Sequence, residues 1–247
     1  MGNPLMVSLV VANLFATNNN CAKNTMFNNV NLYLDQAEMP LGDWEILLAS
    51  GWDRIGTHFF HKRYEQFSIL DDWSSFTQLM PMRYRLDKHF QFTKSQRLIL
   101  KRNQDLTCII RPTVLTDDKF RLFDEWYLAR FNRFSSIFTW VSGTDLPFPT
   151  YEICLYLQGK LVACSFFDIT PNFQYSTLAF YDPNELKRSL GTFTLMCEIQ
   201  NGLKNRKKYH YPGHAYYDNP MYQYKKQFNN VECFDWEAQE WKNLENL

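Results

Sequence analysis

The most constraining feature of this sequence is a run of three strand-like segments in its second half. Apolar and polar residues alternate through 151–158, 161–169 and 175–181, and a Gly-Lys turn and a Pro-Asn turn separate the segments. This period-2 pattern, bounded by turn residues, predicts an antiparallel meander. The elements expected after it are a helix at 189–203, a strand at 209–212, a helix around 217–228 and a strand at 231–236. The sequence therefore predicts an α/β fold.

The first half of the chain mixes short helices and strands. Glycine at position 51 closes an amphipathic segment, and Thr93 is the expected N-cap of a basic helix. The expected elements are a helix at 42–52, strands at 55–64 and 80–90, the basic helix at 94–106 and a helix that begins at Thr116.

Two polar segments organise the chain. Residues 17–30 are rich in asparagine and read as a loop, and 142–150 (SGTDLPFPT) carry the strongest turn signal. We therefore expect a variable N-terminal segment at 1–39, an N-terminal half at 40–145 and a C-terminal half at 146–247. In the last of these, three antiparallel strands followed by helix, strand, helix and strand predict the sheet of a GNAT-type acyltransferase.

Charge and cysteine content exclude several classes of function. The 26 basic and 26 acidic residues cancel, so any contact with nucleic acid must come from a local basic patch. The six cysteines contain no CxxC pair and predict buried thiols, with no metal site and no disulfide framework.

The apolar stretch 5–16 is too short to span a bilayer and has no basic residue before it. We expect a cytosolic protein without a membrane partner.

The string FYDPNELKRSLG at 180–191 is the most specific local pattern. It leads from a strand through a tight turn into a helix start, where Ser189 and Gly191 place backbone N–H groups that can hold a phosphate or an oxyanion. A pyrophosphate loop for coenzyme A would be richer in glycine. The alternative is a purely structural corner that Asp182 and Pro183 close.

Basic and aromatic residues form two further candidate binding regions. Lys94, Arg97 and Lys101 share one face of the basic helix, with Arg102 beside them, which suits phosphate contacts, although a solvated helix face has the same pattern. Several tyrosines in 211–225 can stack on a base or pack in the core. His214 is the only histidine of that segment, and we interpret it as a structural residue. We assign His58 and His61 no metal-binding role.

Four motifs in order make the sequence resemble the arginyl-tRNA–protein transferases and the bacterial leucyl-tRNA–protein transferases. The resemblance covers about residues 40–236. Its motifs are GWDRIGTHFF at 51–60, PMRYRLDKHFQFTKSQRLILKRN at 81–103, FYDPNELKRSLG at 180–191 and YHYPGHAYYDNPMYQYKKQF at 209–228.

The resemblance implies a fold of two related GNAT-like halves, an aminoacyl-tRNA donor and the α-amine of a protein N-terminus as acceptor. Arginine and leucine are the amino acids it favours, and no cofactor is needed because an aminoacyl ester is already activated. The cysteine cluster of the family is missing around Cys21 and before 81–103. An iron–sulfur or zinc site is therefore not expected, and the acceptor is left open.

Site residues follow from the motifs and from the chemistry of aminoacyl transfer. Asp182 is the expected orienting or proton-accepting group, and Tyr224 with Lys225 is expected to hold the donor. The residues expected to bind substrate are Arg97, Arg102, Tyr181, Ser189, Gly191, Tyr211, Gly213, Tyr224 and Lys225. Three rival functions stay open: an acetyl-CoA-dependent N-acyltransferase, tRNA-dependent transfer to a small amine as in the cyclodipeptide synthases, and a non-catalytic tRNA-binding module.

Overall fold

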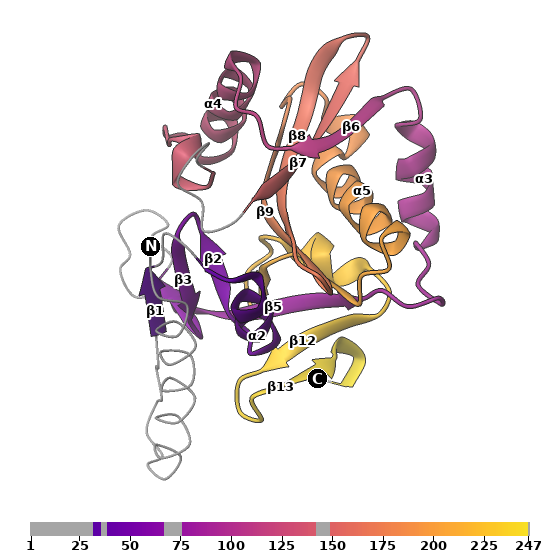
Figure 1. Ribbon diagram of the computed structural model, residues 1–247. Coiled ribbons are helices and arrows are strands. Elements are labelled where there is room, and N and C mark those ends of the chain that lie inside the picture. Colours follow the sequence, from indigo (N-terminus) through magenta and orange to yellow (C-terminus); the bar gives the residue numbers. More distant parts are fainter. Residues whose placement is uncertain (1–31, 36–38, 67–75, 142–148, 247) are drawn as a thin grey trace.

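The expected meander lies toward one end of a ten-stranded sheet (Figure 1). The computed structural model describes residues 32–35, 39–66, 76–141 and 149–246. Strand β7 pairs with β8, and β8 with β9, all antiparallel, while β6 forms the edge beside β7. The bounds are β6 Thr107–Pro112, β7 Thr150–Leu157, β8 Lys160–Ile169 and β9 Phe173–Tyr181. The predicted meander and the mixed α/β class are confirmed.

The other half of the sheet interleaves strands from distant parts of the sequence. Strand β5 lies between β12 and β10, and β10 joins β9 in parallel. Two short strands, β4 and β11, pair with β5 beside the main path, and β13 ends the sheet. The bounds are β4 Tyr64–Gln66, β5 Phe76–Arg85, β10 Tyr209–Tyr211, β11 His214–Tyr216, β12 Val231–Asp235 and β13 Glu240–Asn243.

A separate three-stranded sheet and one helix pack beside β9. The sheet has the order β1-β3-β2, and Trp44 of the helix meets the rings of Phe59 and Tyr175 edge-on. These contacts hold the N-terminal elements on the main sheet. The bounds are β1 Leu32–Asp35, α2 Leu41–Ala49, β2 Asp53–Ile55 and β3 His58–His61.

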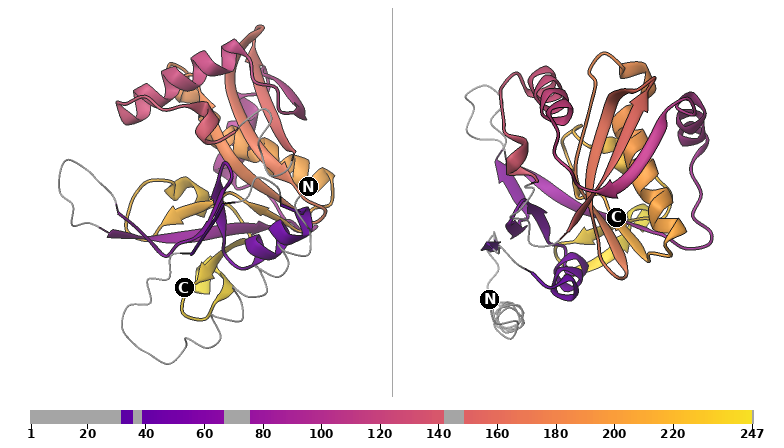
Figure 2. Two further views of the ribbon diagram at one scale, coloured as in Figure 1. Left: turned by 60° about the vertical axis from the view of Figure 1, so that its left-hand side comes forward. Right: turned by 45° about the horizontal axis from the view of Figure 1, so that its top comes forward.

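Helices cover both faces of the meander (Figures 1 and 2). On one face Phe123 of α4 packs with Phe166 and Phe180, and on the other Phe193 of α5 packs with Ile153. Thr93 is the N-cap of α3, as expected, and it forms a reciprocal capping box with Gln96. The bounds are α3 Lys94–Arg102, α4 Asp117–Phe131 and α5 Leu190–Lys204, with short 3₁₀ turns η1 Ile137–Thr139, η2 Leu186–Arg188, η3 Gln223–Gln227 and η4 Leu244–Asn246.

Two helix predictions need correction. The segment 217–228 contains only η3, because Pro220 disfavours a helical residue before it and Tyr222 is left-handed with φ 64°. The basic helix ends at Arg102, where the side-chain amide of Asn103 donates to the carbonyls of Ile99 and Arg188 and ends the helix.

The proposed division of the chain stays a prediction. Residues 17–30 and 142–148 lie outside the described residues. Strands from 40–145 and from 146–247 share one sheet, since β5 lies between β10 and β12. No helix in the described ranges is long and apolar enough to span a bilayer.

A buried ion pair joins the small sheet to the large one. The Arg54 guanidinium donates to both carboxylate oxygens of Asp168, over 2.8 and 2.6 Å, and neither side chain is exposed. Thr150 also donates to Asp168, and Arg54 donates to the Gly56 carbonyl at 2.6 Å. Because every charged group here is matched, removal of one partner leaves an uncompensated buried charge.

We expect Asp168→Asn to lower the free energy of unfolding by about 3 kcal/mol, since it leaves the Arg54 guanidinium buried without its counter-charge. Urea denaturation at fixed pH measures this. The matched control is Asp118→Asn, which breaks an exposed pair with Arg121 on α4 and should leave stability nearly unchanged. Equal effects of the two substitutions would contradict the prediction.

Candidate functional site

A cavity opens where two parallel strands separate. Strands β9 and β10 pair only from Phe173 to Tyr175 and from Tyr209 to Tyr211. After that, Pro212 and Gly213 turn the chain into β11, which pairs with β5, while β9 continues alone beside β8. Gly213 takes φ +78°, a conformation that favours glycine. The cavity has a volume of about 1150 Å³, and α4, β2, β9, the start of α5 and the segment 212–225 line it.

Six of the ten predicted site residues line this cavity, namely Tyr181, Ser189, Gly191, Gly213, Tyr224 and Lys225. Segments that are distant in the sequence therefore meet as the motifs imply. The other four, Asp182, Arg97, Arg102 and Tyr211, lie outside the cavity lining.

The Asp182 carboxylate faces its own turn. It accepts hydrogen bonds from the backbone N–H and side-chain amide of Asn184, and Lys160 lies 2.6 Å away. Burial would raise the pKa of Asp182, but Lys160 and the two Asn184 hydrogen bonds outweigh it and hold the pKa below its usual value. This is the geometry of a turn-capping residue. It agrees with the structural interpretation of Asp182 that the sequence left open beside the catalytic one.

The start of α5 is shaped by close packing. A Cβ atom at Gly191 would lie 2.9 Å from Cε1 of Tyr181, so glycine permits the approach of helix and ring. Ser189 precedes the helix in a left-handed conformation, and its side chain makes no capping hydrogen bond. The first N–H groups of any helix lack partners within it, so this end of the cavity suits an anionic group.

The remaining predicted residues lie apart from the cavity. Arg97 and Arg102 are exposed on α3, and each donates to a backbone carbonyl at 2.5 Å, of Phe92 and of Lys187 respectively. The second hydrogen bond brings the end of α3 near the start of α5. Tyr211 is only 2% exposed and packs in the core, so its predicted contact with substrate has no room in this structure.

The structure brings together a carboxylate and an imidazole that the sequence does not connect. Asp53 Oδ2 lies 2.7 Å from Nδ1 of His214, and both residues line the cavity. The Tyr175 hydroxyl and the Arg54 N–H also donate to Asp53. Burial would raise the pKa of Asp53, but His214, Tyr175 and the Arg54 N–H together lower it, so the carboxylate is ionised. The contact with Nδ1 leaves Nε2 of His214 for a ligand in the cavity.

Sequence reasoning missed Asp53 because it treated the GWDRIG motif only as a family marker, and it set His214 aside as a lone histidine. The available signal was that both residues belong to motifs of one family, 161 positions apart in the chain.

Lys225 adds a buried ammonium beside this pair. Its Nζ donates to the His214 carbonyl at 2.9 Å and lies 4.5 Å from the centre of the Tyr222 ring. Burial lowers the pKa of Lys225 to about 8, an effect that Arg130 reinforces and that Asp53 and Glu198 oppose. An ammonium group with a pKa of about 8 can donate a hydrogen bond to an oxyanion, and it can also exchange a proton near neutral pH.

Glu198 of α5 lines the cavity together with Ser176, and both residues lie close to His210. The Ser176 hydroxyl donates to its carboxylate and lies 3.0 Å from Nε2 of His210. Burial raises the pKa of Glu198 to about 8, against the effect of the Ser176 hydrogen bond. Burial and the Lys225 charge lower the pKa of His210 to about 3, so that ring is neutral.

Among the described residues, one cluster has the composition of a metal site. Glu152, Cys154 and Cys164 bring their ligand atoms within 4.8 Å of one another. The Glu152 carboxylate is held by Lys119 at 2.5 Å and Arg111 at 2.7 Å, and burial raises the pKa of the Cys164 thiol. Two cations already satisfy the carboxylate, so this donor set does not fit a metal ion.

Residues 62–235 match the family model described as arginine-tRNA-protein transferase, C terminus. The aspartate/glutamate leucyltransferase of Xanthomonas oryzae is 30% identical over 169 residues, which cover 63% of this chain and 66% of that protein, just under two thirds. The protein of the same name from Pseudomonas putida is 27% identical over 213 residues, which cover 81% and 84%.

Two solved structures show a partial likeness. One is L-PGS from Bacillus licheniformis, with a TM-score of 0.48 and 14% identity over 61% of this chain and 56% of that one. The other is a GNAT-family protein from Novosphingobium aromaticivorans, with a TM-score of 0.37 and 16% identity over 63% and 61%. Both TM-scores are below 0.5.

We expect Glu198→Gln to stabilise the protein at pH 8 by roughly 4 kcal/mol, because the pKa of Glu198 is raised from 4.5 to about 8 on folding. The unfolded chain loses this proton near pH 4.5, whereas the folded protein keeps it to about pH 8. The Glu198 carboxyl group therefore lowers the free energy of unfolding progressively between these pH values. The glutamine amide does not titrate, so the substitution removes this pH dependence. Chemical denaturation at pH 5 and pH 8 measures it, with the exposed Glu125→Gln as control. A Glu198→Gln protein that is less stable at pH 8 than the wild type would contradict the prediction.

Proposed function

This chain belongs to the arginine-tRNA-protein transferase family, and we propose that it transfers an aminoacyl group from aminoacyl-tRNA to the α-amine of a protein N-terminus. The observation that carries this proposal is the Asp53–His214 pair, which lies 2.7 Å apart at the wall of a cavity large enough for an aminoacyl ester and an acceptor residue. Charged tRNA is a cytosolic substrate, so we also propose that the protein acts in the cytosol.

In the proposed reaction the acceptor α-amine attacks the carbonyl carbon of the aminoacyl ester. A C–N bond forms, and the ester C–O bond to the terminal ribose breaks. Nε2 of His214 takes the proton that the amine loses and returns it to the leaving ribose oxygen. Asp53 holds the imidazole through Nδ1 and stabilises its protonated form.

Two further groups complete the proposed site. The Lys225 ammonium stands beside the His214 carbonyl and can donate to the oxyanion that develops on the ester carbonyl. The α5 start at Ser189 to Gly191 suits the phosphate of the terminal nucleotide. The tight contact of Gly191 with Tyr181 leaves less room for a coenzyme A pyrophosphate than a glycine-rich loop would.

Leucine is the donor amino acid we propose. Leu178 of β9 and Leu190 and Leu195 of α5 are among the apolar residues that line the cavity. The acid beside them, Glu198, keeps its proton to about pH 8, so it offers little charge to an arginyl side chain. The relatives named aspartate/glutamate leucyltransferase agree with this choice. Transfer assays with leucyl-tRNA and arginyl-tRNA in parallel decide it.

We expect His214→Ala to lower single-turnover transfer by about 10²-fold or more, the usual scale for a positioned general base, with the affinity for charged tRNA unchanged. Asp53→Asn should have a comparable effect because it favours the wrong tautomer of the imidazole. Rapid-quench assays at saturating tRNA measure the transfer step.

Asp182→Asn, assayed in parallel, separates the two candidate sites. We expect it to cost about 1 kcal/mol of stability because it weakens the turn, with little effect on transfer. A large decrease in transfer in Asp182→Asn, together with a fully active His214→Ala protein, would move the proton acceptor from His214 to Asp182.

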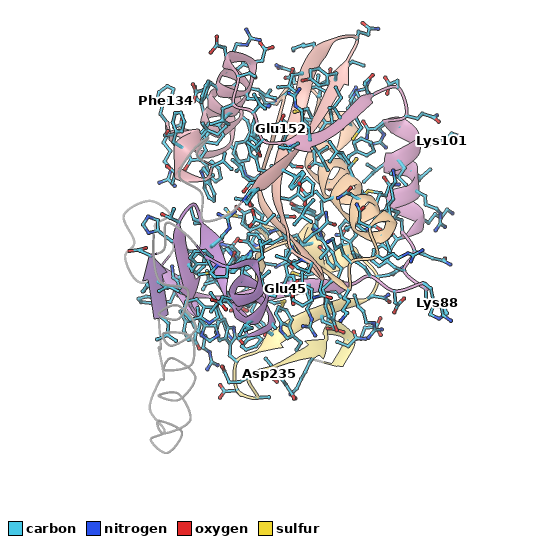
Figure 3. All side chains as sticks on the ribbon, in the orientation of Figure 1. Glu45, Lys88, Lys101, Phe134, Glu152 and Asp235 are labelled. Atoms are coloured by element: carbon cyan, nitrogen blue, oxygen red, sulfur yellow. The ribbon has the colours of Figure 1, made fainter. Side chains whose placement is uncertain are left out.

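The exposed cations of α3 give a separate test of tRNA binding. Among the described residues neither Arg97 nor Arg102 is in an ion pair, and Lys101 projects from the outer side of the same helix (Figure 3). Replacement of both arginines by alanine should weaken tRNA binding and reduce the slope of log K against log salt by about one unit for each phosphate that is no longer neutralised. Replacement of Arg206 and Lys208, exposed beyond the end of α5, is the control. Unchanged affinity and slope in the α3 variant would show that its basic face is only solvated.

A further inference from the structure

A second cavity lies against α5, apart from the candidate site. Its volume is about 350 Å³, and residues of α3, β6 and α5 line it. Neighbouring residues of α5 face different cavities, since Thr194 and Glu198 line the first and Phe193 and Cys197 line the second. A chemical change at the second cavity therefore takes place on a helix that also builds the candidate site.

Two cysteines line this second cavity, Cys108 of β6 and Cys197 of α5. The sequence predicts buried thiols, and four of the five cysteines in the described part of the chain are buried, but Cys108 is exposed. Its strand β6 is the edge of the ten-stranded sheet. Cys108 is thus open to a reagent in solution, whereas Cys197 is only 6% exposed.

The two thiols contact each other, and they differ in proton affinity. The hydrogen bond with Cys197 lowers the pKa of Cys108, and burial opposes this shift. The same hydrogen bond and burial both raise the pKa of Cys197. The Lys204 side chain lines the same cavity. Because the thiolate is the form that attacks a disulfide, Cys108 is the group that reacts first and Cys197 is placed to react second.

A second pair of thiols shows that proximity alone is not enough. Cys154 of β7 and Cys164 of β8 are directly opposite each other, and their sulfur atoms are 3.8 Å apart. Both residues are fully buried, in a cluster with Leu122 and Phe123 of α4. A reagent in solution does not reach them while α4 is in place, so access selects the pair at the second cavity.

We propose that Cys108 and Cys197 are a modification site that takes up a disulfide bond from a low-molecular-weight disulfide of the glutathione type. The Cys108 thiolate attacks one sulfur of the small disulfide, so that a mixed disulfide forms and one small thiol leaves. The Cys197 thiolate then attacks Sγ of Cys108, and the second small thiol leaves. The protein loses two electrons and two protons, and the two released thiols carry them.

The structure and the compartment set the conditions for this reaction. Strand β6 pairs with β7 on one side only, so it can shift toward α5 when the bond forms. In a reducing compartment the bond forms only when the small disulfides rise relative to their thiols. The proposal does not depend on the aminoacyl transfer proposed above.

The test incubates the reduced full chain with defined ratios of oxidised to reduced glutathione, blocks the remaining thiols by alkylation and maps the peptides by mass spectrometry. The wild type should give a peptide pair that joins Cys108 to Cys197, while Cys154 and Cys164 stay reduced. Cys197→Ala should instead keep one glutathione on Cys108. Cys108→Ser should leave Cys197 unmodified, because no exposed thiol starts the exchange.

Cys233→Ala is the matched control, since it removes a buried thiol of β12 that lines neither cavity, and it should oxidise as the wild type does. Iodoacetamide should alkylate Cys108 of the native protein at least about tenfold faster than Cys197. A wild type that stays reduced, that keeps glutathione on Cys108 or that first joins any other two cysteines, Cys21 included, would overturn the proposal. The mapping of the wild type decides this even if a variant fails to fold.

Discussion

The rest of the structure depends on the buried pair between Arg54 and Asp168. It fixes the short strand β2 against β8, and Asp53 is the residue immediately before the arginine. The position of the Asp53 carboxylate at the cavity therefore follows from the ion pair next to it. Tyr175 of β9 secures the same carboxylate from the large sheet. The contacts that hold the two sheets together therefore also position Asp53, and Asp53 in turn orients His214.

Burial sets the proton affinities in the cavity more than any single contact does. It lowers the pKa of Lys225 and raises that of Glu198, so that both lie at about 8. Each of these two groups favours the charged form of the other through their opposite charges. His210, between Ser176 and the core, is held neutral and contributes no charge.

Local patterns predicted most of the fold but only part of the site. Alternation and turn residues located β7, β8 and β9, and the N-cap at Thr93 located the start of α3, because each signal acts over a few neighbours. The prediction of a helix at 217–228 was wrong, because Tyr222 has a left-handed backbone conformation that interrupts a helix there. The Asp53–His214 contact could not be predicted from spacing, since it depends on where β9 and β10 part. Asp182 was singled out for its place at a strand end, yet its carboxylate turns back to Lys160.

The insertion of β5 between β10 and β12 has a consequence for how the protein is made. Residues 76–85 reach the ribosome exit long before residues 209–211 and 231–235, their neighbours in the sheet. During synthesis residues 82–85 of β5 therefore have both edges open until the last sixth of the chain emerges, and folding must close loops of well over a hundred residues. Nascent chains of this protein are expected to fold late and to need protection of that strand from pairing with other chains.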